Sequence, residues 1–219
     1  MFGNEIKAVA LDLDGTVYTG STPVEGAVET VKKILEKGIK IFYFTNNSVK
    51  TRKEICDKLL KMGLPAEEEM VYNSAYASGR YLKEKEYKSV YCCGSKGLEA
   101  EILKSGVDCV TEMPEAVIVG LDETFDYNKM SFALNLLRNE KCLLAACNRD
   151  RSYPVEDGRI LPGCGPIIAA LENACGRSAD VVVGKPETYM LEILCGDHRL
   201  KAKDILVVGD TYESDIVMA

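Results

Sequence analysis

The sequence lacks several features that would place it in broad classes of protein. It has no excess of positive charge: the formal net charge of its 219 residues is −7, which is atypical of a general binder of nucleic acid or acidic membranes. No apolar run approaches the ~20 residues of a membrane span. The short N-terminal apolar run is interrupted by Asp12, which argues against a signal peptide. We therefore expect a cytoplasmic protein with no nucleic-acid or membrane partner.

Cysteine and histidine are not arranged as a structural metal site or a disulfide framework. The nine cysteines are scattered, and the adjacent pair Cys92 and Cys93 lacks the two-residue gap of a zinc knuckle. The single histidine, His198, lies in the polar stretch "GDHRL", which we expect to be a solvated loop. Because an odd cysteine count without framework spacing argues against a secreted scaffold, we expect reduced and mostly buried thiols.

The chain does contain a regular alternation of apolar runs and helix-like segments. In a first block, strands are predicted at 6–13, 39–44, 180–183 and 204–209, and helices at 24–37, 51–62 and 186–195. In a second block, strands are predicted at 88–93, 107–110, 116–121 and 142–147, and helices at 75–84, 96–104, 128–139 and 165–175. This alternation predicts an α/β protein: a Rossmann-like parallel-sheet core with a large α/β insert.

Four short polar stretches follow predicted strands of the first block. They are "DLDGT" (12–16), "TNNS" (45–48), "GKP" (184–186) and "GDTYESD" (209–215). Because the carboxyl ends of parallel strands share one edge of a sheet, we expect the four stretches to meet. Together they supply carboxylates, a lysine, a hydroxyl group and amide donors, a set that suits a cation and a phosphate.

Each stretch has a plainer interpretation when it is taken alone. Asp12 and Asp14 are compatible with a turn that ends a strand, or with a calcium loop, although an EF-hand needs glycine at its sixth position. "TNNS" is compatible with a turn or a helix cap, Lys185 with a surface lysine, and Asp210 and Asp215 with helix-start residues. "GSKG" and "GCG" resemble dinucleotide loops, but neither completes G-x-G-x-x-G.

The four stretches in this order resemble the motifs of the haloacid dehalogenase (HAD) superfamily. "LDLDGTVY", "FTNNS", "VGKP" and "VGDTYESDI" are similar to its subclass IIA, the NagD-like and 4-nitrophenylphosphatase-like branch, which carries a large α/β cap between the second and third motifs. "AVIVGLDETFDY" and "CNRDRSYPVEDGRILPGCGPIIAALE" resemble parts of that cap. The resemblance implies a catalytic core at 1–74 and 179–219 and a cap domain at 75–178.

The resemblance also implies an activity, a Mg²⁺-dependent hydrolysis of a small soluble phosphate monoester. Asp12 would be the nucleophile that forms an aspartyl-phosphate, and Asp14 the general acid and base. Thr45 and the amide of Asn46 would hold the phosphoryl oxygens, and Lys185 would balance their charge.

By the same resemblance, the Mg²⁺ ligands would be the Asp12 carboxylate, the Asp14 backbone carbonyl and Asp210. Asp215 would orient a metal-bound water. In the cap, Asp122, Asn148 and Asp150 could contact the substrate and are equally compatible with turn residues.

Two other functions and the oligomeric state stay open at this point. The chain could bind phosphate esters as a regulatory protein without turnover, or transfer the phosphoryl group to an alcohol. A homodimer is compatible with the family resemblance.

The chain ends soon after the fourth motif, with seven residues after Tyr212. Members of the family continue with further strands and helices. We therefore expect an exposed sheet edge and apolar surface near the C-terminus, from a shortened chain or from a place that a neighbouring subunit covers.

Overall fold

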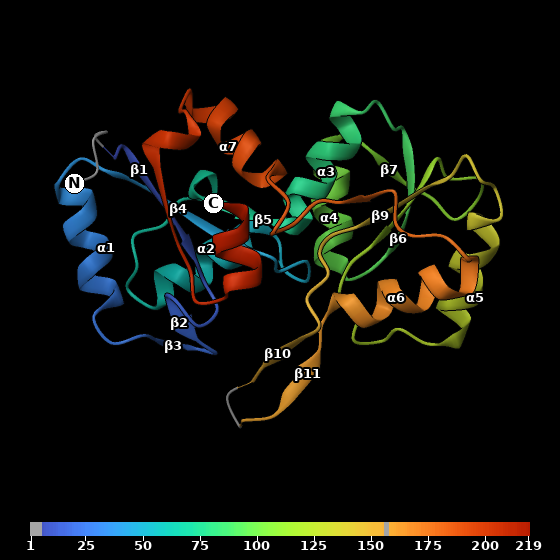
Figure 1. Cartoon of the computed structure of the whole chain (residues 1–219), viewed down its shortest axis with the longest axis horizontal. Coiled ribbons are helices and arrows are strands. Elements are labelled where there is room, and N and C mark those ends of the chain that lie inside the picture. The colour runs from blue at the N-terminus through green and yellow to red at the C-terminus, as the bar shows by residue number, and fades with distance from the viewer. Residues whose placement is uncertain (1–5, 156–157) are drawn as a thin grey trace.

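The computed structural model describes residues 6–155 and 158–219. Within these residues, most strands belong to two parallel sheets that are flanked by helices (Figure 1), and the predicted α/β class is confirmed. None of the helices in this part of the chain combines the length and apolarity that crossing a bilayer needs.

The first sheet has four parallel strands in the order β13-β1-β4-β5. Their bounds are Ala8–Asp12 (β1), Lys40–Thr45 (β4), Val71–Asn73 (β5) and Ile205–Val208 (β13). All five residues of β1 are buried, because neighbouring strands flank it and helices cover both faces of the sheet. The sequence predicted β1, β4 and β13, whereas β5 has only three residues and was missed.

Two pairs of helices cover the faces of the first sheet. Helices α1 (Ala27–Glu36) and α2 (Arg52–Lys61) pack on one face, and α3 (Ser74–Glu84) and α7 (Tyr189–His198) on the other. Helix α2 begins at the capping box that its sequence predicts. The Thr51 hydroxyl accepts from the Glu54 amide, and the Glu54 carboxylate accepts from the Thr51 amide.

The second sheet has five parallel strands in the order β12-β9-β8-β6-β7. Their bounds are Ser89–Cys93 (β6), Asp108–Cys109 (β7), Ala116–Val119 (β8), Leu143–Ala146 (β9) and Val181–Val182 (β12). Helices α5 (Tyr127–Leu137) and α6 (Cys164–Cys175) cover one face. Helices α4 (Lys96–Ser105) and α3 cover the other. Helix α3 therefore packs against both sheets and joins them.

The strand predicted at 180–183 belongs to the second sheet and not to the first. Val181 and Val182 of β12 pair with Ala145 and Ala146 of β9. Its apolar run resembles the core strands, and its pairing partner is not visible in the sequence. The domain division at 178/179 remains a prediction, and by strand pairing the residues just after it go with the cap.

The prediction of a solvated loop at His198 is wrong. Helix α7 runs to His198, beyond the predicted end at residue 195. The imidazole ring centroid lies 4.4 Å from that of Phe42. Burial, with a smaller contribution from the nearby charge of Lys40, lowers the pKa of His198.

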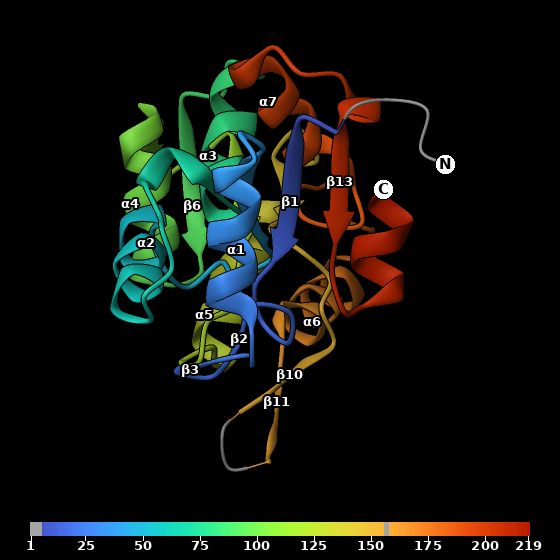
Figure 2. The same cartoon turned by 90° about the vertical axis from the view of Figure 1, so that its left-hand side faces the viewer.

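Two short hairpins and three short helical segments complete the described structure. The hairpins are β2 (Tyr18–Thr19) with β3 (Thr22–Pro23) and β10 (Ser152–Pro154) with β11 (Ile160–Pro162). The helical segments are Glu68–Met70 (η1), Ala202–Asp204 (η2) and the π-helical Tyr212–Ile216 (η3). Hairpin β10–β11 projects away from both sheets in Figures 1 and 2.

The expected sheet edge near the C-terminus is present. In the described residues β13 pairs only with β1, and Leu206 and Val208 are 43% and 37% exposed. Tyr212 and Val217, which follow β13, are also exposed. Figure 2 shows this last segment beside β13.

Candidate active site

Four charged residues meet beyond the carboxyl ends of the first sheet. Oxygen atoms of Asp12, Asp210 and Asp215 lie within 4.8 Å of one another. The Lys185 Nζ atom lies 2.5 Å from Asp12 Oδ1 and 2.5 Å from Asp215 Oδ1. Asp12 is the last residue of β1, and Asp210 follows β13. The prediction that these stretches meet is confirmed. Asp12 and Asp210 reach the cluster from strands of one sheet, as expected, whereas Lys185 reaches it from β12 of the second sheet.

Three of the four residues of this cluster are buried, and their charges act on one another. Asp12, Lys185 and Asp215 are 8%, 3% and 1% exposed. Burial raises the pKa of Asp12 to about 7, although the charge of Lys185 acts in the opposite direction. Burial also opposes the charge of Lys185, but the carboxylates of Asp12 and Asp215 outweigh it and raise the pKa of the lysine. Lys185 therefore stays cationic and bridges the two carboxylates.

Gly15 lets Asp210 approach the first motif. Its φ of +92° lies in the left-handed region, where glycine is favoured. A Cβ atom at this position would lie 2.2 Å from Asp210 Oδ2. The glycine of "DLDGT" is thus needed both for the turn and for the space that the fourth motif occupies.

Asp14 lies on the same turn but reaches solvent. The surrounding protein still removes water from its carboxyl group and so raises its pKa, although the charges of Lys58 and Lys185 act in the opposite direction. The buried Tyr18 hydroxyl donates a hydrogen bond to Asp14, and the Lys58 Nζ atom lies 3.5 Å from the Tyr18 ring centroid. Nothing in the sequence pattern indicates that Tyr18 is a neighbour of the acid pair.

Asp215 is oriented by both of its oxygens. Oδ1 accepts from Lys185, and Oδ2 accepts from the Thr211 amide at 3.1 Å. A Cβ atom at Gly209 would lie 2.3 Å from the Asp215 Cγ atom, so the chain has no room for a side chain there. This geometry agrees with a residue that orients other groups.

Thr45 is the last residue of β4, and Asn46 follows it beside this cluster. The Thr45 hydroxyl accepts from the Asn47 amide at 3.1 Å. The Asn46 side chain is fully engaged: Nδ2 donates to the Lys185 carbonyl at 3.0 Å, and Oδ1 accepts from the Lys185 amide at 2.8 Å. Asn46 therefore fastens the main chain that carries the lysine.

Two of the three cap candidates reach this region. The Asp150 carboxylate accepts from Asn46 Nδ2 at 3.0 Å, and Asn148 Nδ2 donates to the Asn46 carbonyl at 2.7 Å. Asp122 instead accepts from Lys129 at 2.6 Å and from the Thr124 amide at 2.9 Å, as expected of a turn residue. The sequence did not distinguish these roles.

The carboxylate cluster suits a hard divalent cation. Asp12, Asp210 and Asp215 supply three carboxylates, the donors that Mg²⁺ accepts in proteins. Lys185 neutralises only part of their charge, and Asp210 is exposed, so an ion and its waters could reach it. The donor set therefore fits the ion that the sequence predicts.

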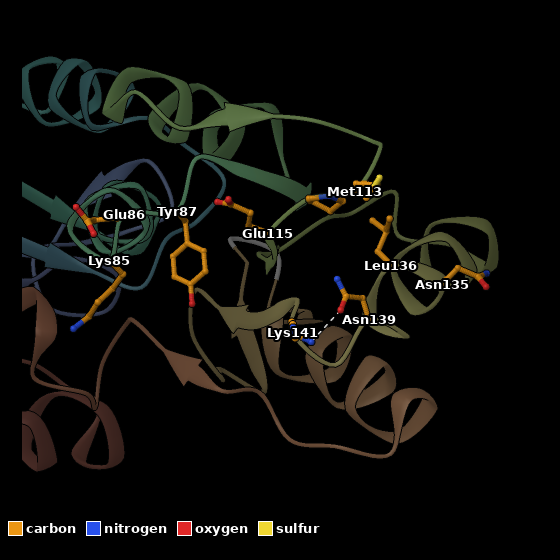
Figure 3. Close-up of a pocket in the computed structure, with 10 residues that line it drawn as sticks. Lys85, Glu86, Tyr87, Met113, Glu115, Asn135, Leu136, Asn139 and Lys141 are labelled. Carbon is orange, nitrogen blue, oxygen red and sulfur yellow. Dashed lines mark hydrogen bonds between the residues drawn. The ribbon is translucent and has the colours of Figure 1, made fainter.

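A cavity of about 700 Å³ lies elsewhere, at the amino ends of the second sheet (Figure 3). Residues 85–87, just before β6, and 113–115, just before β8, form part of its lining. Tyr87 and Glu115 point toward it in Figure 3. The charged cluster stands at the carboxyl ends of the first sheet, so the candidate site is defined by its charges and not by this cavity.

Comparisons with known proteins agree with this geometry. A model described as haloacid dehalogenase-like hydrolase matches residues 9–108, and one described as HAD-hydrolase-like matches residues 182–219. The chain is 30% identical over 243 residues to glycerol-3-phosphate phosphatase of Rattus norvegicus, covering 98% of this chain and 75% of the relative. It is 32% identical over 212 residues to 5'-nucleotidase YutF of Bacillus subtilis, covering 96% and 82%.

A solved structure shows the same relationship in three dimensions. The p-nitrophenyl phosphatase from Archaeoglobus fulgidus superposes with a TM-score of 0.92 at 34% identity, covering 98% of this chain and 82% of that one. The chain belongs to the haloacid dehalogenase-like hydrolases. Within that family it is a phosphatase of the NagD-like and 4-nitrophenylphosphatase-like group.

Proposed function

We propose that this phosphatase hydrolyses small soluble phosphate esters with Mg²⁺ and through an aspartyl-phosphate on Asp12. The observation that carries the proposal is the position of Asp12. It ends a buried central strand, lies 2.5 Å from Lys185, and belongs to a cluster with Asp210 and Asp215. A carboxylate held in this way can attack phosphorus and divide one difficult displacement into two easier ones.

The proposed reaction has two steps. The Asp12 carboxylate forms a bond to phosphorus, the ester P–O bond breaks, and Asp14 gives its proton to the departing alcohol. Asp14 then takes a proton from water, which attacks phosphorus and releases Asp12 and inorganic phosphate. Lys185 offsets the negative charge that gathers around phosphorus, and Thr45 with the Asn46 amide would orient the phosphoryl oxygens.

The residues that would hold Mg²⁺ are Asp12, Asp210 and the backbone carbonyl of Asp14, with Asp215 orienting a bound water. When bound, the ion would neutralise charge between the carboxylates and the phosphate dianion. Without such compensation, three carboxylates would repel the substrate.

The proposed substrates are small. The second sheet and its loops contact the loop that follows β4, and a cap in this place would exclude large substrates from the charged cluster. Two of the relatives are a glycerol-3-phosphate phosphatase and a 5'-nucleotidase, and these activities are those of the relatives. For this chain we propose the same broad class, with phosphoglycolate, nucleoside monophosphates, sugar phosphates and pyridoxal phosphate as compounds to screen.

Turnover of 4-nitrophenyl phosphate with Mg²⁺ tests the proposal. We expect release of 4-nitrophenol that depends on Asp12. Tight metal-dependent binding without release would instead support a binding or regulatory protein. Phosphorylation of an added alcohol would support a phosphotransferase.

The proposal also covers the cellular location and the oligomeric state of the protein. A cytoplasmic location is supported by its nine cysteines, all of which are free thiols. A homodimer stays a prediction, and sedimentation of the purified chain over a range of concentrations tests it.

A further inference from the structure

One cap residue is connected to the catalytic lysine through a single intervening side chain. Asp150 follows β9 of the second sheet, whereas Asn46 follows β4 of the first. The Asn46 amide group has two N–H donors, of which one serves the Lys185 carbonyl and the other the Asp150 carboxylate. Its oxygen accepts from the Lys185 amide. Asp150 thus completes the hydrogen bonds of the group that holds the lysine.

Asp150 is itself held rigidly. Its amide donates to Asn148 Oδ1 at 3.0 Å, and its carbonyl accepts from the Gly165 amide at 2.8 Å. A Cβ atom at Gly163 would lie 2.3 Å from that same carbonyl oxygen, so the loop fits closely against the start of α6. The "GCG" stretch, which does not complete a dinucleotide motif, here serves to seat Asp150.

The other end of this connection is the charged cluster. Asn46 is only 8% exposed, so an unpaired Nδ2 donor would be costly there. Lys185 carries its ammonium group between Asp12 and Asp215. A shift of the Lys185 main chain would therefore move the cation away from the nucleophile.

We propose that Asp150 is a positioning residue for Lys185, acting through the side-chain amide of Asn46. The inference rests on the proposed phosphatase function for its catalytic consequence, but the contact itself is a property of the fold. In this role Asp150 acts as a hydrogen-bond acceptor, and it does not touch the reacting atoms.

The first test uses hydrogen exchange at single backbone amides in Asp150→Ala and Asp150→Asn. We expect Asp150→Ala to lower protection of the Lys185 amide about tenfold, because the group that accepts from it loses an anchor. Protection of the Gly184 amide, which donates to the Cys147 carbonyl, should hold. Asp150→Asn keeps an acceptor oxygen and should stay within about threefold of the parent protein.

The second test is steady-state hydrolysis of 4-nitrophenyl phosphate by the same variants. Asp150→Ala should lower kcat about tenfold with little change in KM, and Asp150→Asn should restore most of it. Arg149→Ala is the matched control: its side chain pairs with Glu172 on the surface and does not contact Asn46.

The outcomes separate the two proposals. Unchanged Lys185 protection in Asp150→Ala would overturn the positioning role whatever the activity. A raised KM with unchanged kcat, or equal damage in both Asp150 variants, would also overturn it, because it would indicate a substrate contact or a need for charge. No turnover by the parent protein would contradict the proposed function, while the exchange measurement would still decide the positioning role.

Discussion

The two parallel sheets of this chain meet at their carboxyl ends, and the two edges differ in what they carry. Beyond the first sheet lie the buried carboxylates of Asp12 and Asp215, and Lys185, which follows β12 of the second sheet, reaches both of them. The rest of the second edge fits closely against the first through glycines, through the polar side chains of Ser95 and Asn148, and through the Asp150 carboxylate. The comparison indicates that similar architectures can contribute differently: the first edge supplies the carboxylates of the cluster, and the second supplies the lysine and a closely fitting cover.

The residues after β4 form the contact between the two edges. The Ser95 hydroxyl donates to the Val49 carbonyl at 2.9 Å, and the Leu121 amide donates to the Ser48 hydroxyl at 2.9 Å. A Cβ atom at Gly97 would lie 2.1 Å from the Val49 carbonyl oxygen. The loop that begins at Asn46 is therefore held from the cap side, which explains how the cap can affect the arrangement of the charged cluster.

Asparagine substitution of one aspartate at each sheet gives the largest predicted contrast. Asp12→Asn should lower kcat for 4-nitrophenyl phosphate by ~10⁴-fold or more, because the amide is a poor nucleophile. Asp108→Asn, on the exposed part of β7, should leave kcat unchanged. Equal rates for Asp12→Asn and the parent protein would remove Asp12 from the mechanism.

Removal of the metal should affect the first edge and leave the structure of the second unchanged. Chelation by EDTA should lower turnover by roughly 10³-fold, and added Mg²⁺ should restore it, because the carboxylates around Asp12 need a counter-charge. The near-ultraviolet circular dichroism of the cap tyrosines should not change. Full activity in excess EDTA would contradict the Mg²⁺ assignment.

Lys185→Met tests the charge balance of the first edge. We expect kcat to fall ~10²-fold because charge at phosphorus is no longer offset. Without metal, the free energy of unfolding should also fall by about 3 kcal/mol, since two buried carboxylates lose their shared partner. Lys141→Met, at the far end of the second sheet, is the control in thermal unfolding and in activity. A Lys185→Met variant with parental kcat would show that the lysine has no role in catalysis.

Alanine substitution at two helical glycines tests how closely the second sheet's edge fits against the loop after β4. It has the smallest expected effect. Gly97→Ala places a methyl group against the Val49 carbonyl and should lower the free energy of unfolding by about 2 kcal/mol. Gly196→Ala, in α7 with open space around it, should raise it by about 0.5–1 kcal/mol. Chemical denaturation measures both, and a stabilised Gly97→Ala protein would show that the contact is loose.

Sequence pattern was sufficient for the long elements and for the charged cluster. The buried strands β1 and β4 and the capped helix α2 have strong periodicity. Residues at the carboxyl ends of one parallel sheet converge, so Asp12 and Asp210 could be brought together from the sequence. Lys185 was predicted to join them on the same ground, although its strand belongs to the other sheet. Strand β5 and the two hairpins have too few residues for a pattern. Strand β12 shows that an apolar run does not say which sheet it joins.

The contact between Asn46 and Asp150 could not be predicted for a different physical reason. It depends on how the second sheet docks on the first, and the residues are 104 positions apart in the chain. "TNNS" and "CNRD" each predict a turn, and nothing in either stretch indicates its partner. His198 is a related case, because its packing on Phe42 depends on where α7 ends.

The most direct test of the account is to identify the residue that carries the phosphoryl group during turnover. The protein is mixed with Mg²⁺ and a phosphate ester labelled at phosphorus, quenched in acid, and its peptides are mapped. We predict transient label on the peptide that contains Asp12, and none in Asp12→Asn. Label on another residue, or steady turnover with no labelled peptide, would contradict the claim that this edge of the first sheet supplies the nucleophile.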